Sequence, residues 1–295
     1  IQTAQKFKKI ITSLDNTRPV TEALCSWDQD WEIFDPHAAV LDIVGYNYMM
    51  HKAESDHERC PERVMWQTES YPRDAFANWK HTMERPYIIG DMVWTGLDYL
   101  GESAIGQFHY DGESRKEHYQ ENHFPYHGAY CGDVDLTGWR KPISHYRSML
   151  WNLKEGSPDI YLAVKEPDFY YKGHISETQW SVWPTWESWN WQGWEGRNID
   201  VEIYSKSPRV RLYLNDQLVA EKETGINTQY KAVITLPYQP GILKAVSLDA
   251  NGQEVKESIL QTSGEPASIK LTADRKHILA SGEDLAYITL EVIDK

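Results

Sequence analysis

Cysteine is scarce in this sequence, and long apolar runs and an excess of positive charge are missing. The three cysteines, Cys25, Cys60 and Cys131, are widely spaced and form no CxxC pair, which argues against a zinc site and a disulfide framework. No run approaches the roughly 20 apolar residues that cross a bilayer, so we expect no membrane-spanning segment. The formal net charge of -14 argues against nucleic acid and anionic membranes as partners, because phosphate contacts need surplus Lys and Arg.

Phenylalanine is also scarce for a sequence so rich in the other aromatic residues. There are 6 Phe against 13 Trp and 18 Tyr, and indole and phenol rings carry a polar group that suits half-wet surfaces. Sugar rings, with one apolar face and a rim of hydroxyls, are one class of ligand that fits such surfaces. Packing between domains is the competing explanation, and we favour it for most of the individual residues.

The sequence begins and ends inside secondary-structure patterns. It has no initiator Met and no signal-peptide layout. Apolar residues at helical spacing over residues 1–14 predict an amphipathic helix, and LAYITLEVIDK ends on a strand pattern. A length of 295 residues suits two or three domains. We therefore expect these residues to be a piece of a longer protein.

Residues 1–165 alternate between helix and strand patterns. A second helix is predicted over residues 72–84, starting at Pro72. Strand followed by loop, helix and strand is typical of parallel α/β units. Four such strands are half of an eight-stranded α/β barrel, in which the chemistry lies at the C-terminal ends of the strands. The predicted strands are RPVTEAL, VLDIVGYNYM, residues 64–68 and RPYIIGDMVW.

From residue 166 onward the pattern changes to short alternating strands between Asn, Asp, Gly and Pro turns. Residues 166–263 therefore predict an antiparallel β-sandwich. Tight hairpins are expected at Asn215–Asp216 and at Asn251–Gly252. After a linker at Gly264–Pro266, residues 264–295 predict the start of a second sandwich that stops after roughly three strands. The expected fold class is thus a multidomain chain with α/β and all-β parts.

Glu69 is the first candidate for chemistry. The strand pattern VMWQTES ends in this carboxylate, which is either a structural partner for a cation or a catalytic group. Asn47 and Tyr48 follow one neighbouring strand, and Trp94 follows another. An indole can stack on a sugar face, and a phenol can hydrogen-bond a carboxylate and hold it ionised. This combination suits glycoside hydrolysis with a carboxylate nucleophile.

Five stretches resemble the later half of the catalytic barrel of family 2 glycoside hydrolases, the β-galactosidase and β-glucuronidase family. They occur in the family's order and spacing, and are RPVTEAL, DIVGYNYM, VMWQTES, GDMVWTGLDYLGE and GDVDLTGWRKPISHYRSMLW. WPTWESWNWQG and VRLYLNDQLV resemble the immunoglobulin-like domain behind that barrel. The resemblance covers essentially the whole chain. It implies the C-terminal half of a (β/α)8 barrel over 1–165, an immunoglobulin-like sandwich over 166–263, and the truncated start of another over 264–295.

The resemblance also implies roles for individual residues. Glu69 matches the nucleophile, Tyr48 with Asn47 beside it matches the tyrosine close to that nucleophile, and Trp94 matches the aromatic floor of the sugar site. Glu102, in the following loop, is expected on the leaving-group side. The implied activity is that of a retaining exo-β-glycosidase acting on terminal β-linked sugars, with β-galactosidase as the favoured specificity.

One part of the family pattern is missing. Retaining enzymes use a second carboxylate as general acid/base, which in this family lies in an Asn-Glu pair. No such pair occurs at the matching place, and we expect it upstream of Ile1, so that the 295 residues alone are inactive. Glu22 and Glu102 are the possible replacements, but neither carries the family pattern. The competing interpretation of the chain is a non-catalytic carbohydrate-binding or spacer fragment.

No metal and no cofactor is expected. The groups His51, His57 and Glu58, and His123 and His127, fit no established ligand spacing. The expected partner is an oligosaccharide or polysaccharide substrate, and a homo-oligomer is left open. The resemblance implies a periplasmic or extracellular location. Turn and capping roles are favoured for Asp133 and Asp135. Interface packing is favoured over a carbohydrate platform for the tryptophan run Trp180, Trp183, Trp186, Trp189, Trp191 and Trp194.

Overall fold

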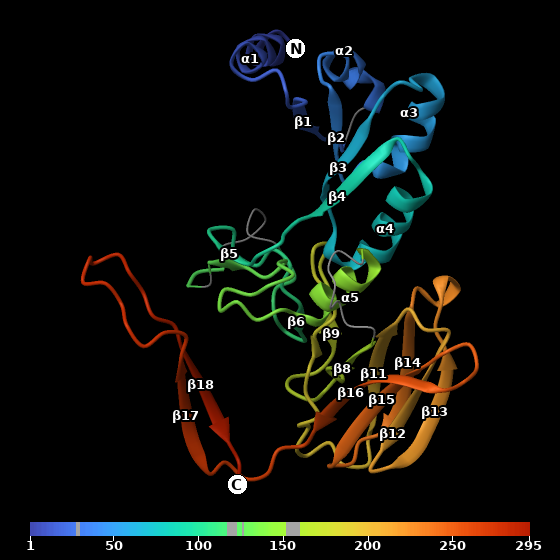
Figure 1. Ribbon diagram of the computed structural model, residues 1–295, viewed down its shortest axis with the longest axis vertical. Helices are drawn as coiled ribbons and strands as arrows, with labels where there is room; N and C mark the ends of the chain where they lie inside the picture. The colour runs from blue at the N-terminus through green and yellow to red at the C-terminus, as the bar shows by residue number, and fades with distance from the viewer. Residues whose placement is uncertain (28–29, 117–122, 126, 152–159) are drawn as a thin grey trace.

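The computed structural model describes residues 1–27, 30–116, 123–125, 127–151 and 160–295. A parallel sheet with helices occupies the N-terminal part, and antiparallel sheets occupy the C-terminal part (Figure 1). Irregular loops between residues 95 and 141 lie where the two parts meet. None of the helices in the described ranges is both long enough and apolar enough to cross a membrane.

The parallel sheet has four strands in chain order. They are β1 (Thr21–Leu24), β2 (Ile43–Asn47), β3 (Met65–Ser70) and β4 (Ile88–Val93), and each pairs in parallel with the next. All four predicted strands are confirmed, although each is shorter than its sequence pattern or shifted along it. Because the strands are parallel and adjacent, their carboxyl ends meet at one edge of the sheet.

Helical segments precede the first of these strands and connect the others. The predicted first helix is confirmed as α1, and the predicted helix over 72–84 begins with a 3-10 turn and continues as α4. Figure 1 shows α3 and α4 on the same side of the sheet. The helical segments are α1 (Gln2–Leu14), η1 (Trp31–Phe34), α2 (Asp35–Ala38), η2 (Met50–Lys52), α3 (Ala53–Arg59), η3 (Pro72–Asp74) and α4 (Ala75–Glu84).

A buried carboxylate fastens α3 to the sheet. Asp56 is fully buried and accepts hydrogen bonds from Trp31 Nε1 at 2.6 Å and from Tyr46 Oη at 2.6 Å. Two guanidinium groups neutralise it, Arg59 at 2.6 Å and Arg63 at 2.7 Å. A buried charge is tolerated only when it is paired and hydrogen-bonded, and both oxygens of Asp56 meet this condition.

The sandwich consists of two four-stranded sheets, in the orders β10-β8-β11-β14 and β13-β12-β15-β16. Alternate residues of both sheets face a shared core that includes Trp189, Trp191 and Trp194. The strands are β8 (Ile160–Lys165), β10 (Thr185–Trp186), β11 (Asn198–Ser205), β12 (Arg209–Leu214), β13 (Gln217–Glu223), β14 (Lys231–Pro237), β15 (Ile242–Leu248) and β16 (Glu254–Gln261).

The predicted boundary at residue 165 is wrong by one strand. β8 lies before that boundary, yet it pairs antiparallel with β11 inside the sandwich. Its residues are buried on both faces, because Leu162 and Val164 face the sandwich core while Tyr161 and Ala163 pack toward α4 and α5 (Pro142–Trp151). The strand pattern YLAVKEPDFYY itself indicates a sandwich strand, so only the boundary was placed too late: the sandwich begins at Ile160.

The predicted hairpin turns are confirmed. Asn215 and Asp216 both have positive φ, 50° and 62°, between the paired residues Leu214 and Gln217, as a type I′ turn requires. Asn251–Gly252 lies in the turn that joins β15 and β16, with Gly252 at φ 80°.

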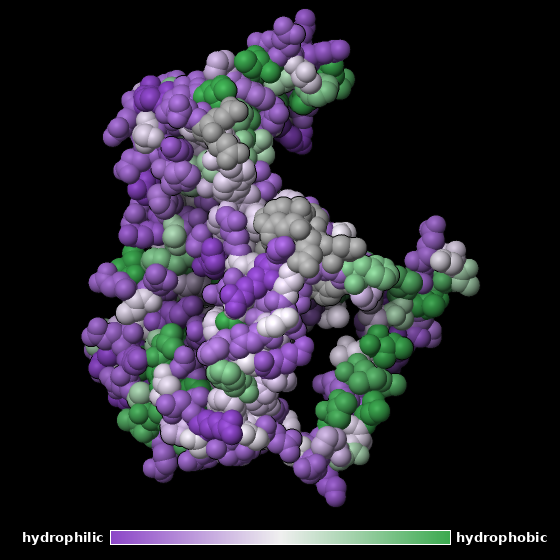
Figure 2. All heavy atoms as spheres, turned by 180° about the vertical axis from the view of Figure 1, so that it is seen from behind, coloured by the Kyte–Doolittle hydropathy of each residue, from purple (hydrophilic) through white to green (hydrophobic). Residues whose placement is uncertain are grey.

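The C-terminal segment has two strands where roughly three were predicted. β17 (Ser268–Ala273) and β18 (Ile288–Ile293) pair antiparallel, and all of their residues are exposed. Figure 2 shows apolar side chains over this hairpin and on α1. Of the predicted apolar face of α1, only Ala4 is buried, whereas Phe7 is 58% exposed and Leu14 is 84% exposed.

We predict that Asp56→Asn destabilises the α/β part strongly, because it leaves Arg63, 8% exposed, without its buried partner. The expected loss is about 3–5 kcal/mol in the free energy of unfolding, measured by urea denaturation followed by circular dichroism. Glu84→Gln, which removes an exposed pair with Lys80, is the matched control, with an expected loss of at most about 0.5 kcal/mol.

The same substitution changes the pH dependence of stability. Burial raises the pKa of Asp56, but hydrogen bonds from Tyr46, Arg59 and Trp31 and the charge of Arg63 outweigh burial, so that the pKa lies below its ordinary value of 3.8. A carboxylate with a lowered pKa contributes stability above the unfolded-state pKa and loses it as the pH falls through the folded-state pKa. Below pH 4 the unmodified chain should therefore lose more stability than Asp56→Asn, and equal losses would contradict this assignment.

Candidate active site

One cavity lies at the carboxyl ends of β2, β3 and β4. All five residues singled out from the sequence line it: Asn47, Tyr48, Glu69, Trp94 and Glu102. The cavity is open on one side, and the space within it free of protein atoms is about 1060 Å³, including open solvent. We call it the strand-end cavity. The structure thus brings together every predicted site residue, although they span more than fifty positions of the sequence.

Glu69 and Tyr48 face each other across the β2–β3 pairing. Glu69 lies opposite Asn47 in the register, and the Tyr48 backbone N–H donates to the Glu69 carbonyl oxygen at 2.8 Å. The Tyr48 backbone has φ 60°, a left-handed conformation that is uncommon for tyrosine. The Tyr48 hydroxyl also lies close enough to the Glu69 carboxylate for the two side chains to interact. Burial, together with the negative charge of Glu69, raises the pKa of Tyr48, so its phenol keeps its proton.

Asn47 is held in place by the strand next to it. The Thr68 hydroxyl donates to Asn47 Oδ1 at 2.7 Å. At Gly45, β2 has no room for a side chain between its two neighbours. A Cβ there would lie 2.5 Å from the Glu22 carbonyl oxygen of β1 and 2.9 Å from the Thr68 side chain of β3. With its oxygen occupied by Thr68, Asn47 retains its amide N–H groups as donors for a ligand in the cavity.

Trp94 and Glu102 are joined through Tyr99. The Trp94 backbone N–H donates to Ser70 O at 3.0 Å, which continues the β3–β4 pairing, and its indole N–H donates to Tyr99 Oη at 3.2 Å. The Tyr99 hydroxyl donates in turn to Glu102 Oε2. The rings of Trp94 and Tyr99 meet edge to face, with their centroids 6.0 Å apart. This chain of contacts orients both the indole and the carboxylate that face the cavity.

Five further residues line the strand-end cavity and were not predicted. Trp27 packs on the Tyr48 ring, with centroids 5.6 Å apart, and Trp180 Nε1 donates to Tyr48 Oη at 2.9 Å. Trp180 belongs to the tryptophan run noted in the sequence, so the residue was singled out but its position in this cavity was not predicted. The five residues are Cys25, Trp27, Ile105, Gln179 and Trp180.

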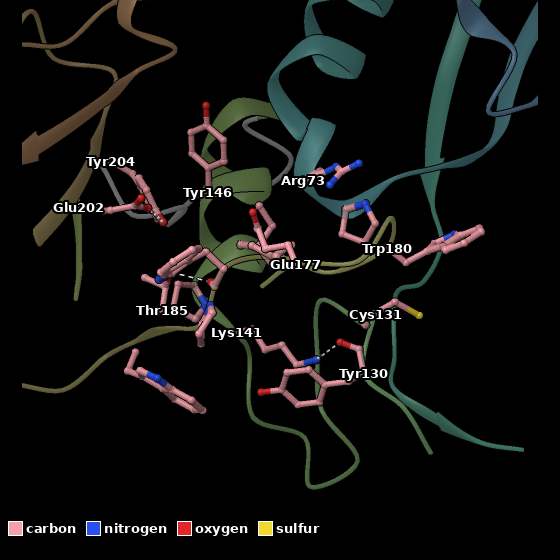
Figure 3. A pocket seen from close by; sticks show the side chains of 18 of the residues that line it. Arg73, Tyr130, Cys131, Lys141, Tyr146, Glu177, Trp180, Thr185, Glu202 and Tyr204 are labelled. Atoms are coloured by element: carbon pink, nitrogen blue, oxygen red, sulfur yellow. Dashed lines mark hydrogen bonds between the residues drawn. The ribbon is translucent and has the colours of Figure 1, made fainter. Parts of the chain in front are cut away.

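The tryptophan run divides among three environments, of which the strand-end cavity, lined by Trp180, is the first. Trp189, Trp191 and Trp194 pack in the sandwich core, so the interface packing predicted for them is wrong. Trp183 and Trp186 line a second cavity between the α/β part and the sandwich (Figure 3).

The second cavity is bounded by residues of both parts, including Arg73, Lys141 and Tyr146 from the α/β part and Glu202 and Tyr204 from the sandwich. Figure 3 shows the Lys141 ammonium donating to the Tyr130 carbonyl oxygen, at 2.9 Å. Trp180 lines this cavity as well as the strand-end cavity, so it forms a wall between them.

The remaining acidic candidates have structural roles. Asp135 accepts hydrogen bonds from Thr137 and from the Trp139 backbone, which confirms its turn role. Asp133 instead pairs with Arg147 at 2.8 Å, so the turn or capping role predicted for it is wrong. Glu22 is exposed and lies 2.9 Å from His37, and it does not line the strand-end cavity. Within the described ranges, no group of three or more His, Cys, Asp or Glu residues has an arrangement that could hold a metal ion.

Comparison with known proteins identifies the chain's relatives. A member of glycosyl hydrolase family 2 from Bacteroides cellulosilyticus is 34% identical, with a TM-score of 0.85 over 99% of this chain and 36% of that chain. The β-galactosidase BoGH2A of Bacteroides ovatus is 25% identical over 99% of this chain and 34% of its own length. The chain belongs to glycoside hydrolase family 2. It spans about a third of the length of these relatives.

Two further similarities concern parts of the molecule or its fold. A β-glycosidase from Bacteroides vulgatus, 19% identical, shares the fold with a TM-score of 0.69. A domain of unknown function, DUF4982, matches residues 196–256, which contain most of the sandwich strands from β11 to β16.

We predict that Cys25 reports the charge of Glu69. Burial and the negative charge of Glu69 raise the pKa of the Cys25 thiol, and the thiolate is the reactive form. In Glu69→Gln the charge is gone, so this pKa falls and the thiolate fraction at pH 8 rises. Alkylation of Cys25 by iodoacetamide, followed by peptide mass spectrometry, should accelerate roughly two- to tenfold.

Cys60 in the same sample is the control, because it lies beside Arg63 and does not line the strand-end cavity. Its alkylation rate should not change. An unchanged rate at Cys25 would show that the Glu69 charge does not reach into this cavity.

Proposed function

We propose that this chain carries the nucleophile and part of the sugar site of a retaining exo-β-glycosidase, which hydrolyses terminal β-linked sugars. The observation that carries the proposal is the convergence of Glu69, Tyr48, Asn47, Trp94 and Glu102 on one cavity. Membership of glycoside hydrolase family 2 supports it. We also propose that β1 to β4 form the second half of a (β/α)8 barrel, because sequential parallel order and strand-end chemistry are features of that fold.

In the first step, the Glu69 carboxylate attacks the anomeric carbon. A carbon–oxygen bond to Glu69 forms while the glycosidic carbon–oxygen bond breaks, and the departing oxygen takes a proton from a general acid that we place outside these 295 residues. In the second step, water attacks the anomeric carbon, releases Glu69 and loses its proton to the same group. The two inversions give retention of configuration.

The neighbouring residues suit these steps. A nucleophile must be held in a fixed orientation, and the Tyr48 hydroxyl, which keeps its proton, lies beside the Glu69 carboxylate as a donor that can orient it. The Trp94 indole offers an apolar face to the sugar ring, while Asn47 and Glu102 offer a donor and an acceptor to its hydroxyl groups.

A neutral sugar fits the cavity better than a uronic acid. Its described lining holds two carboxylates, Glu69 and Glu102, and neither Lys nor Arg. A uronate would place a third negative charge beside them without a cation to pair with. We therefore propose a β-galactoside as the substrate, in line with the similarity to the β-galactosidase of Bacteroides ovatus, and a β-glucuronide as the less favoured alternative.

Trapping of the intermediate tests the nucleophile directly. In the full-length natural protein that contains this sequence, a 2-deoxy-2-fluoro-β-galactoside with a dinitrophenyl leaving group should label the peptide that carries Glu69, detected by mass spectrometry. This leaving group needs no proton, so labelling does not depend on the general acid. Glu69→Gln should abolish labelling and lower kcat by roughly 10³- to 10⁶-fold.

Azide rescue distinguishes a carboxylate that acts as the nucleophile from one that acts as the general acid/base. In Glu69→Ala, azide can occupy the space of the missing carboxylate, attack the anomeric carbon directly and give an α-galactosyl azide by a single inversion. Glu22→Gln, at an exposed position outside the cavity, is the control and should retain normal turnover. Binding of sugar without labelling, and without any effect of Glu69→Gln, would instead favour a non-catalytic carbohydrate-binding role.

A further inference from the structure

We infer that Trp180, which lies in the segment before β10, is a positioning residue for the proposed nucleophile: it fixes the Tyr48 hydroxyl so that the single phenolic proton points to Glu69. The inference rests on the proposed function of Glu69. It assigns a role in the site to a segment that lies between two strands of the C-terminal part and that the sequence placed in domain packing.

The contact between Trp180 and Tyr48 is specific. Trp180 Nε1 lies 2.9 Å from Tyr48 Oη, and the two rings meet at 90° with their centroids 5.8 Å apart. Tyr71 also packs against both rings, at 5.4 Å from Trp180 and 4.5 Å from Tyr48. The three rings therefore leave the Tyr48 phenol little freedom to rotate out of the site.

The direction of the proton follows from the chemistry of the groups. An indole N–H can only donate, so Tyr48 Oη must accept from Trp180. The phenol then has one proton left to give, and its other polar partner is the Glu69 carboxylate. A carboxylate without a proton only accepts. The hydrogen bonds therefore run in one direction, from Trp180 to Tyr48 to Glu69.

The segment that carries Trp180 is anchored at several points. Arg73 Nη1 donates to the Thr178 carbonyl oxygen at 3.3 Å, and the Gln179 side-chain amide donates to Tyr71 Oη. The buried Ser181 hydroxyl accepts from the Thr178 backbone N–H at 2.6 Å. Residues 177–184 also lie between two short strands that are each held by another part of the chain: β9 (Ile175–Ser176) pairs with residues 109–110, and β10 pairs with β8. This anchoring gives the indole a fixed position, which a positioning residue needs.

The test compares Trp180→Phe with Tyr48→Phe in the full-length natural protein. Trp180→Phe keeps an aromatic ring but removes the indole N–H. Both variants should leave the Glu69 carboxylate less well oriented and lower the rate constant of labelling by the 2-fluoro-galactoside roughly 3- to 10-fold, while the binding constant of that reagent stays unchanged. A merely structural role would loosen the cavity and weaken binding of the reagent as well.

The double variant and a control complete the design. If Trp180 acts through Tyr48, Trp180→Phe in the Tyr48→Phe background should cause no further loss of the labelling rate constant. Trp180→His, which restores an N–H donor, should recover part of the labelling rate. Trp183→Phe, which removes an indole N–H bonded to the Glu166 carbonyl oxygen beside the second cavity, should leave the labelling rate unchanged.

Three results would overturn the inference: additive effects in the double variant, an unchanged labelling rate constant with weakened binding of the reagent, or an equal effect of Trp183→Phe. If Trp180→Phe does not fold by near-ultraviolet circular dichroism, a labelling rate constant unchanged by Tyr48→Phe overturns the inference by itself. A lowered rate constant in Tyr48→Phe, together with a rate in Trp180→His close to that of the unmodified protein, supports it. Failure of the proposed function is distinguishable, because then the unmodified protein itself would show no label on Glu69.

Discussion

The site depends on the position of one phenol. The Tyr48 backbone N–H donates to the Glu69 carbonyl oxygen at 2.8 Å, its hydroxyl interacts with the Glu69 carboxylate, and the same hydroxyl accepts the Trp180 indole N–H at 2.9 Å. It therefore links β2, β3 and the segment before β10, three parts of the chain that are distant in sequence. A left-handed backbone at a bulky residue costs free energy, which surrounding contacts must offset. The contacts to Glu69 and Trp180 are of that kind.

Buried ion pairs hold the elements around this phenol. Asp56 joins α3 to β2 by accepting a hydrogen bond from Tyr46, two residues before Tyr48. In the loop that follows Trp94, the buried Asp98 carboxylate accepts from Lys141 at 2.8 Å and from the Gly132 backbone N–H at 2.7 Å. These contacts tie the loop after β4 to the start of α5. Such pairs add little net stability compared with apolar packing, but breaking one is costly. Their effect is to hold irregular loops in a single arrangement around the strand ends.

The strand-end residues were predictable, whereas the contribution of the sandwich was not. Parallel strands place their carboxyl ends together, so the sequence positions of Tyr48, Glu69 and Trp94 were enough to predict one site. Trp180 contacts Tyr48 across 132 positions, and no local pattern reports such a pairing. The boundary between the two parts was likewise placed too late, because the run Ile160–Lys165 is buried on both faces and lacks the alternation that marks the other sandwich strands.

Glu102 shows how the surroundings of a carboxylate limit its role. Two carboxylates in one cavity suggest the nucleophile and the proton donor of a retaining enzyme. However, Glu102 Oε2 accepts the hydroxyl proton of Tyr99, whose ring is held by the Trp94 indole. Glu102 also follows Gly101 and so lacks the asparagine of the Asn-Glu pair that the family resemblance implies for the general acid. The contact suits a carboxylate that accepts hydrogen bonds from sugar hydroxyls, and the general acid is better sought on another part of the full-length protein.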